Sequence, residues 1–149
     1  MKLLVLPLFL VLFLFNQDKK TGTTQQKDKN TLVGTWELED FYYYDNNEVS
    51  DTVPTTEGYR QLKMFTKNRV MWTRFVPKDS VEWFGYGVYV ATDDQLIETL
   101  EYGSASMMKI IDTLRVFTFE LQLAKDTYSQ ITLDADGNRF SSENYKRVE

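Results

Sequence analysis

Apolar and polar side chains alternate along most of the chain from residue 32 onward, which is the period of a β-strand with one buried face. The clearest segment runs from 113 to 123, where Phe117, Phe119 and Leu121 alternate with Thr118 and Glu120. Turn signals such as an Asp-Gly pair at 136–137 separate the alternating segments. The pattern predicts eight strands, at residues 33–44, 59–65, 69–75, 82–90, 95–102, 113–123, 127–133 and 140–148.

The stretches between these segments are short, with two exceptions. Residues 45–58 are predicted to be a long acidic loop, and residues 103–111 have the one composition compatible with a helix or a crossover loop. An antiparallel sheet of this size must hide its apolar face by closing on itself or by stacking two layers. Connections between consecutive strands favour closure. The predicted fold is therefore all-β, a single eight-stranded up-and-down antiparallel barrel with at most one short helix near 103–111.

The N-terminal residues have a different character. Lys2 precedes an unbroken apolar run over residues 3–15, which is shorter than the roughly 20 residues that a membrane-spanning helix needs. Residues 1–15 are predicted to be a signal peptide, although no small-residue cleavage site follows and an uncleaved anchor is the alternative. Residues 16–31 hold almost only polar side chains and are predicted to be a flexible leader. Residues 32–149 form the predicted barrel domain, and the expected location is periplasmic or secreted.

Composition narrows the possible functions. The 149-residue chain has 17 basic and 22 acidic residues, a net charge of −5, and no basic stripe, which argues against nucleic acid and against anionic membrane surfaces. Membrane contact is expected only through an uncleaved N-terminus, and the oligomeric state is left open. The absence of histidine and cysteine excludes imidazole ligands, a Ser-His-Asp triad and a thiolate nucleophile. Residues 134–140 lack the spacing of a calcium loop. No metal and no cofactor is expected.

Several short motifs carry a family resemblance. Gly34 and Trp36 open the first strand as G-x-W, and Arg147 lies in the last strand. The chain also has K-M-F-T at 63–66, V-M-W-T-R-F at 70–75, G-Y-G-V-Y at 85–89, E-T-L-E-Y at 98–102 and E-N-Y-K-R-V at 143–148. Together these resemble the lipocalin and calycin barrels, and more closely the small secreted lipocalin-like domains of bacteria. The chain departs from that pattern where those domains often carry histidine, at Arg69 and Thr99.

The resemblance implies that Trp36 plugs the closed end of the barrel, that Arg147 packs across its ring, and that Gly34 lets the chain pass close by. With Trp36 inward, strict alternation places Leu38, Asp40 and Tyr42 on the same face. Applied to the other strands, it predicts an interior lining of Trp72, Arg74, Tyr89, Glu98, Leu100, Phe117, Phe119, Tyr128, Gln130, Glu143 and Tyr145.

Two interpretations of the polar lining residues remain open. Arg74 pairs with Glu98 or holds a ligand carboxylate; alternatively, Arg74, Glu98, Gln130 and Glu143 form a closed network that only fixes the core. The 22 aromatic residues (3 Trp, 9 Tyr and 10 Phe) fit either a full core or a lined cavity.

Three functions follow from these interpretations. The first is binding of a small hydrophobic or amphipathic ligand in the interior, without catalysis. The second is a filled barrel that acts as a protein-interaction module of the cell envelope through the acidic loop. The third is a small isomerase or hydrolase that uses Glu98 or Glu143 as a base, with Tyr89 or Tyr128 as a proton partner.

Overall fold

The computed structural model of the chain describes residues 31–78 and 81–149, and this part is almost entirely β-structure. The predicted signal peptide and nearly all of the predicted leader lie outside the described residues. Within the described ranges, no helix combines the length and the hydropathy needed to cross a bilayer. The elements are β1 (Gly34–Asp45), β2 (Glu48–Pro54), β3 (Arg60–Phe65), β4 (Arg69–Phe75), β5 (Trp83–Ala91), β6 (Gln95–Gly103), α1 (Ala105–Ile111), β7 (Val116–Leu123), β8 (Thr127–Leu133) and β9 (Arg139–Arg147).

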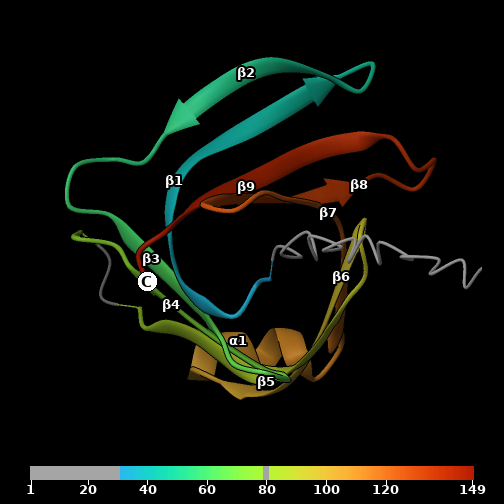
Figure 1. Cartoon of the computed structure of the whole chain (residues 1–149). Helices are drawn as coiled ribbons and strands as arrows, with labels where there is room; N and C mark the ends of the chain where they lie inside the picture. The colour runs from blue at the N-terminus through green and yellow to red at the C-terminus, as the bar shows by residue number, and fades with distance from the viewer. Residues whose placement is uncertain (1–30, 79–80) are drawn as a thin grey trace, which may run out of the picture.

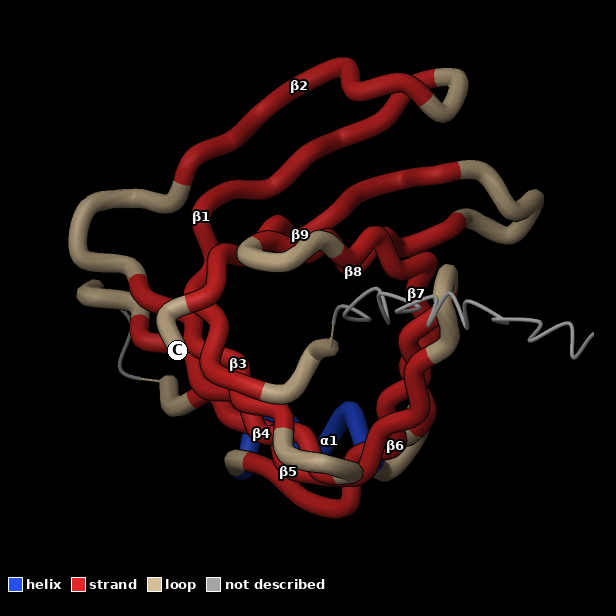
Figure 2. Tube along the Cα trace, in the orientation of Figure 1, coloured by secondary structure: helices blue, strands red, loops and turns tan. Residues whose placement is uncertain are grey.

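The strands form one antiparallel sheet that closes on itself. From β3 to β9 each strand pairs with the next in the sequence, and β1 pairs with β9 along one edge and with β3 along the other. Figure 1 and Figure 2 show the resulting ring. The predicted all-β class and the single short helix are confirmed.

The ninth strand, β2, corrects the predicted loop at 45–58. A tight turn at Asn46 and Asn47, both with positive φ (51° and 64°), leads from β1 into β2. This geometry is typical of a two-residue hairpin turn. Strand β2 pairs only with the C-terminal half of β1, residues 40–45, and lies on the outside of the ring (Figure 1). All of its residues are exposed, so it has no apolar face and no alternation by which sequence analysis detects a strand.

A β-bulge changes the faces of β1. The register against β9 shifts between Leu38 and Asp40, which adds one residue to β1. Trp36 and Leu38 are buried, but beyond the bulge Phe41 and Tyr43 face the interior. The prediction that Asp40 and Tyr42 share the face of Trp36 is therefore wrong, because strict alternation does not survive an extra residue.

Helix α1 lies against β5 and β6 and connects β6 to β7. The Ser104 hydroxyl caps its first turn by accepting a hydrogen bond from the Met107 backbone nitrogen at 3.3 Å. Met107 and Ile111 are buried against Leu100 of β6. The helix therefore presents Met107 to the interior of the ring.

Candidate functional site

Trp36 closes one end of the interior. Its indole is fully buried, and Nε1 donates to the Leu32 carbonyl at 2.7 Å. The Arg147 guanidinium lies 4.0 Å from the centre of the indole ring, a cation–π contact, and donates to the carbonyls of Val33 and Thr31 at 2.9 and 2.7 Å. Gly34 has a φ of +137°, and a Cβ there would lie 2.5 Å from Arg147 Nη1. Glycine is thus required for the guanidinium to reach its position.

A cavity of about 320 Å³ lies in the ring beyond this closed end. Side chains from β1, β3, β4, β6, α1, β7, β8 and β9 border it. Of the residues predicted to line the interior, those that border the cavity are Trp72, Arg74, Glu98, Leu100, Phe117, Phe119, Gln130, Glu143 and Tyr145.

Tyr89 and Tyr128 were predicted in the same lining, but they do not border the cavity. Tyr128 packs edge-on against Trp36, with ring centres 4.8 Å apart, in the core of the closed end. Tyr89 packs against Phe65, and its hydroxyl donates to the Thr66 carbonyl at 2.8 Å. Both side chains have the inward parity that alternation assigns them. They lie too close to the closed end to reach the open space.

The structure also brings residues to the cavity that sequence reasoning missed. Phe41 and Tyr43 border the cavity because of the bulge in β1, and no local sequence motif predicts that bulge. Gln61 and Lys63 are buried in β3, whereas the apolar Met64 between Lys63 and Phe65 is 38% exposed. On this strand polar side chains point inward and an apolar one points outward, which is the reverse of the usual pattern. Only Phe65, two residues after Lys63, indicates from the sequence which face is buried. The remaining additions are Met107, Thr132, Ser141 and Ser142.

A buried ion pair is part of the cavity lining. Lys63 Nζ lies 2.6 Å from Glu98 Oε1, and both side chains are 3% exposed. Lys63 also donates to Gln130 Oε1 at 2.6 Å. The pairing of Glu98 with Arg74, one of the two predicted roles of Arg74, is therefore wrong, because Lys63 of β3 reaches Glu98 of β6 across the interior of the ring. A buried charge must be paired in this way to be tolerated.

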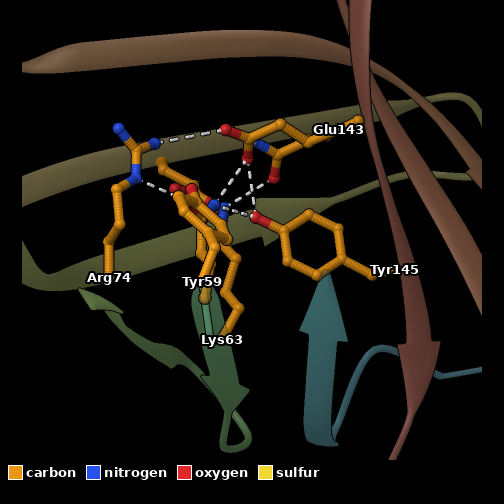
Figure 3. A network of polar contacts seen from close by, with 8 residues as sticks. Tyr59, Lys63, Arg74, Glu143 and Tyr145 are labelled. Carbon is orange, nitrogen blue, oxygen red and sulfur yellow. Dashed lines mark hydrogen bonds and ion pairs between the residues drawn. The ribbon is translucent and has the colours of Figure 1, made fainter. Parts of the chain in front are cut away.

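Glu143 organises a second group of polar contacts (Figure 3). Its Oε2 accepts hydrogen bonds from Gln61 Nε2, Gln130 Nε2 and Tyr145 Oη at 3.0, 2.9 and 2.6 Å. Arg74 Nη2 lies 3.6 Å from the other oxygen, Oε1. Gln130 donates to Glu143 and accepts from the lysine of the buried pair, so the two groups are one connected network.

Gln61 holds Arg74 in place. Its Oε1 accepts from Arg74 Nε and from Tyr59 Oη, each at 2.7 Å. Burial raises the pKa of Tyr59, partly offset by the positive charge of Arg74. Burial and the neighbouring Glu143 carboxylate raise the pKa of Tyr145 well above its ordinary value. Both phenols therefore stay protonated at neutral pH and act as donors.

Apolar side chains form the other walls. Trp72 and Phe117 pack on the cluster formed by Leu100 and helix α1. A Cβ at Gly85 would lie 2.7 Å from Trp72 Nε1, so this glycine of β5 makes room for the indole. The result is a cavity with aromatic walls and one connected polar region.

Comparisons with known proteins bear on the fold of the chain but not on the role of this site. No family model and no curated protein matches the chain. A solved structure of an uncharacterized protein from Bacteroides eggerthii is similar, with a TM-score of 0.53 and 16% sequence identity. The match covers 79% of this chain and 100% of that chain. At this identity the likeness shows a shared all-β fold and carries no activity with it.

Two further observations concern the groups that metal or acid–base chemistry would use. Within residues 31–78 and 81–149, no group of three or more His, Cys, Asp or Glu side chains is placed to hold a metal ion. Tyr89, one of the predicted proton partners, is engaged by the Thr66 carbonyl. The phenol that does contact Glu143 is Tyr145, and it shares that carboxylate oxygen with two amide donors.

Proposed function

We propose that this protein is a lipocalin-like barrel that binds a small, partly apolar ligand in its interior and is not catalytic. The observation that carries the proposal is the cavity of about 320 Å³, with aromatic walls and a connected polar region. Small-molecule sites span about 300–1,000 Å³ and combine apolar lining with a few converging polar groups. The interior therefore has room for one small molecule.

The closed end supports the lipocalin-like part of the proposal. Gly34, Trp36 and Arg147 lie together as the resemblance implies, with the guanidinium across the indole. The ring closure between β1 and β9 agrees with a barrel. The predicted export signal at 1–15, and with it the periplasmic or secreted location, remains part of this proposal.

The same volume bears on the alternatives. A filled interaction module needs an interior too small for a ligand, well below the roughly 300 Å³ at which useful pockets begin. An isomerase or hydrolase needs an internal carboxylate free to take a proton. Glu98 is paired with Lys63, and Glu143 has three donors on Oε2 and the Arg74 guanidinium 3.6 Å from Oε1, so both carboxylates already lie beside cations. Ligand binding is the function that uses the site as it stands.

Binding energy would come mainly from the walls. Each Å² of apolar ligand surface removed from water contributes about 25 cal/mol. Trp72 and Phe117 supply broad apolar surface on one side of the cavity, and Phe41 on another. The polar region would then fix the orientation of the ligand.

The test is to purify the protein from its native host and to identify co-purifying small molecules by mass spectrometry after denaturing extraction. We expect one reproducible molecule, which is lost in Trp72→Ala and Arg74→Ala. Thr73→Ala is the matched control, because Thr73 lies between these residues on β4 with its side chain exposed outside the cavity. Extracts that contain no reproducible molecule, or a molecule retained equally in all three variants, would contradict the proposal.

A further inference from the structure

The positive and negative charges of the side chains that border the cavity are equal in number. Two cations, Lys63 and Arg74, and two anions, Glu98 and Glu143, border it. The cavity therefore carries no net ionic charge before a ligand enters. A ligand with a full charge would leave an unbalanced charge among aromatic walls, which is costly in a poorly solvated site.

The two ion pairs differ in what they leave available. Lys63 and Glu98 are 2.6 Å apart and 3% exposed, so this pair is closed. Arg74 and Glu143 are 3.6 Å apart, with side chains 32% and 24% exposed. Arg74 is held through Nε, and Glu143 is held through Oε2. Among the four ionic side chains, the guanidinium end of Arg74 and the Oε1 of Glu143 are thus the groups most open to a ligand.

These groups form an adjacent donor and acceptor. The terminal nitrogens of Arg74 can only donate, and the Glu143 carboxylate can only accept. An uncharged group with an acceptor next to an N–H donor matches both at once. A carboxylate would meet Arg74 but would lie beside Glu143, and an ammonium or amidinium would meet Glu143 but would lie beside Arg74.

Resting on the proposed function, we propose that the polar group of the ligand is an uncharged carboxamide or lactam, whose oxygen accepts from Arg74 and whose N–H donates to Glu143. This replaces the carboxylate that the sequence suggested for Arg74. The apolar body of the ligand lies against Trp72 and Phe117.

Three probes with the same ring system test the charge of this group: 2-naphthamide, 2-naphthoate and 2-naphthamidine, titrated into the protein by calorimetry at neutral pH. We expect the amide to bind at least about tenfold more tightly than either ion, because an ion leaves an unbalanced charge beside the like-charged member of the pair. Equal or tighter binding of the naphthoate, or of the naphthamidine, would overturn the inference.

Two variants invert the expected order. In Glu143→Gln the arginine keeps its proton and its charge, so the cavity becomes cationic and the naphthoate should become the tightest of the three probes. In Arg74→Met the cavity becomes anionic, and the naphthamidine should gain affinity relative to the parent protein. Ser141→Ala borders the cavity without changing its charge, and it should leave the order of the probes unaltered.

The second variant covers the case in which the first does not fold, which thermal unfolding of each protein would reveal. Unchanged probe order in a folded Glu143→Gln or Arg74→Met protein would overturn the inference. So would the absence of binding by all three probes. The proposed function has its own readout, the co-purified molecule. A carboxylate-bearing molecule in the extract would reject the inference and keep the proposed function, whereas an empty extract would reject both.

Discussion

The two ends of the ring are built from the same strands but are filled differently. At the closed end, Trp36 and Phe65 pack edge-on against Tyr128, with ring centres 4.8 and 6.0 Å from its ring, and none of the three borders the 320 Å³ cavity. Towards the open end, Lys63 and Gln130 take the next inward positions on two of these strands. One step of two residues along β3 or β8 thus replaces an aromatic ring by a polar side chain.

This difference in side chains implies a division of roles between the two ends. Packed aromatic rings contribute to stability through buried area and ring contacts. Paired charges and amides contribute little net stability, since their desolvation offsets much of their attraction. The comparison teaches that the closed end holds the fold together and that the polar region gives the cavity its chemistry. Each prediction below tests one side of that division.

The largest effect is expected from replacing the tryptophan of the closed end. Trp36→Ala removes a fully buried indole and the surface on which Arg147 packs, so we expect a loss of about 5 kcal/mol in the free energy of unfolding. Trp72→Ala, at the cavity wall, should cost only about 1–2 kcal/mol while abolishing ligand retention. Urea unfolding of both proteins measures the difference. Equal losses for the two tryptophans would contradict the division between the ends.

A smaller but still large effect is expected from the buried ion pair. Lys63→Met leaves Glu98 charged and unpaired at 3% exposure, which should cost about 3 kcal/mol in unfolding free energy. Replacing both partners, as Lys63→Met with Glu98→Leu, should return the protein to within about 1 kcal/mol of the parent. Urea unfolding of the single and double variants checks this. A double variant as unstable as the single one would mean that the pair itself stabilises the fold.

The fold was largely predictable because the closing sheet needs one continuous apolar face. Alternation and turn residues located eight of the strands, and the composition of 103–111 located α1. Strand β2 was missed because all of its side chains are exposed, so it pairs through its backbone alone. A strand with two solvated faces carries no periodic signal.

The sequence predicted which face of most strands points inward. It did not predict how far each side chain lies from the closed end or which charged residues pair. The bulge after Leu38 depends on how β1 meets β9, which is a tertiary property. Lys63 was overlooked because lysine is rarely buried, and its burial is explained only by Glu98 of β6 opposite it. Tyr128 was assigned correctly to the inward face, yet its distance from the cavity depends on the shear of the closed sheet. These features arise from strands that are distant in sequence.

The smallest effect at neutral pH is expected from Tyr128→Phe, and it becomes visible only in alkali. Burial, with the Glu98 and Glu143 carboxylates, raises the pKa of Tyr128 well above its ordinary value, and its hydroxyl is buried beside the stacked ring of Tyr145. Removing that hydroxyl should change the unfolding free energy by less than about 1 kcal/mol at pH 7. The folded state favours the neutral phenol, so the parent loses stability as the pH rises above about 10, where the unfolded chain ionises this tyrosine. Tyr128 accounts for about 1.4 kcal/mol of that loss per pH unit, and Tyr128→Phe should reduce the slope by this amount.

Phe65→Leu alters the same aromatic cluster without a titrating group and should leave the slope unchanged. Urea unfolding between pH 7 and pH 11 measures the slopes, and identical slopes for the parent and Tyr128→Phe would show that water reaches the closed end.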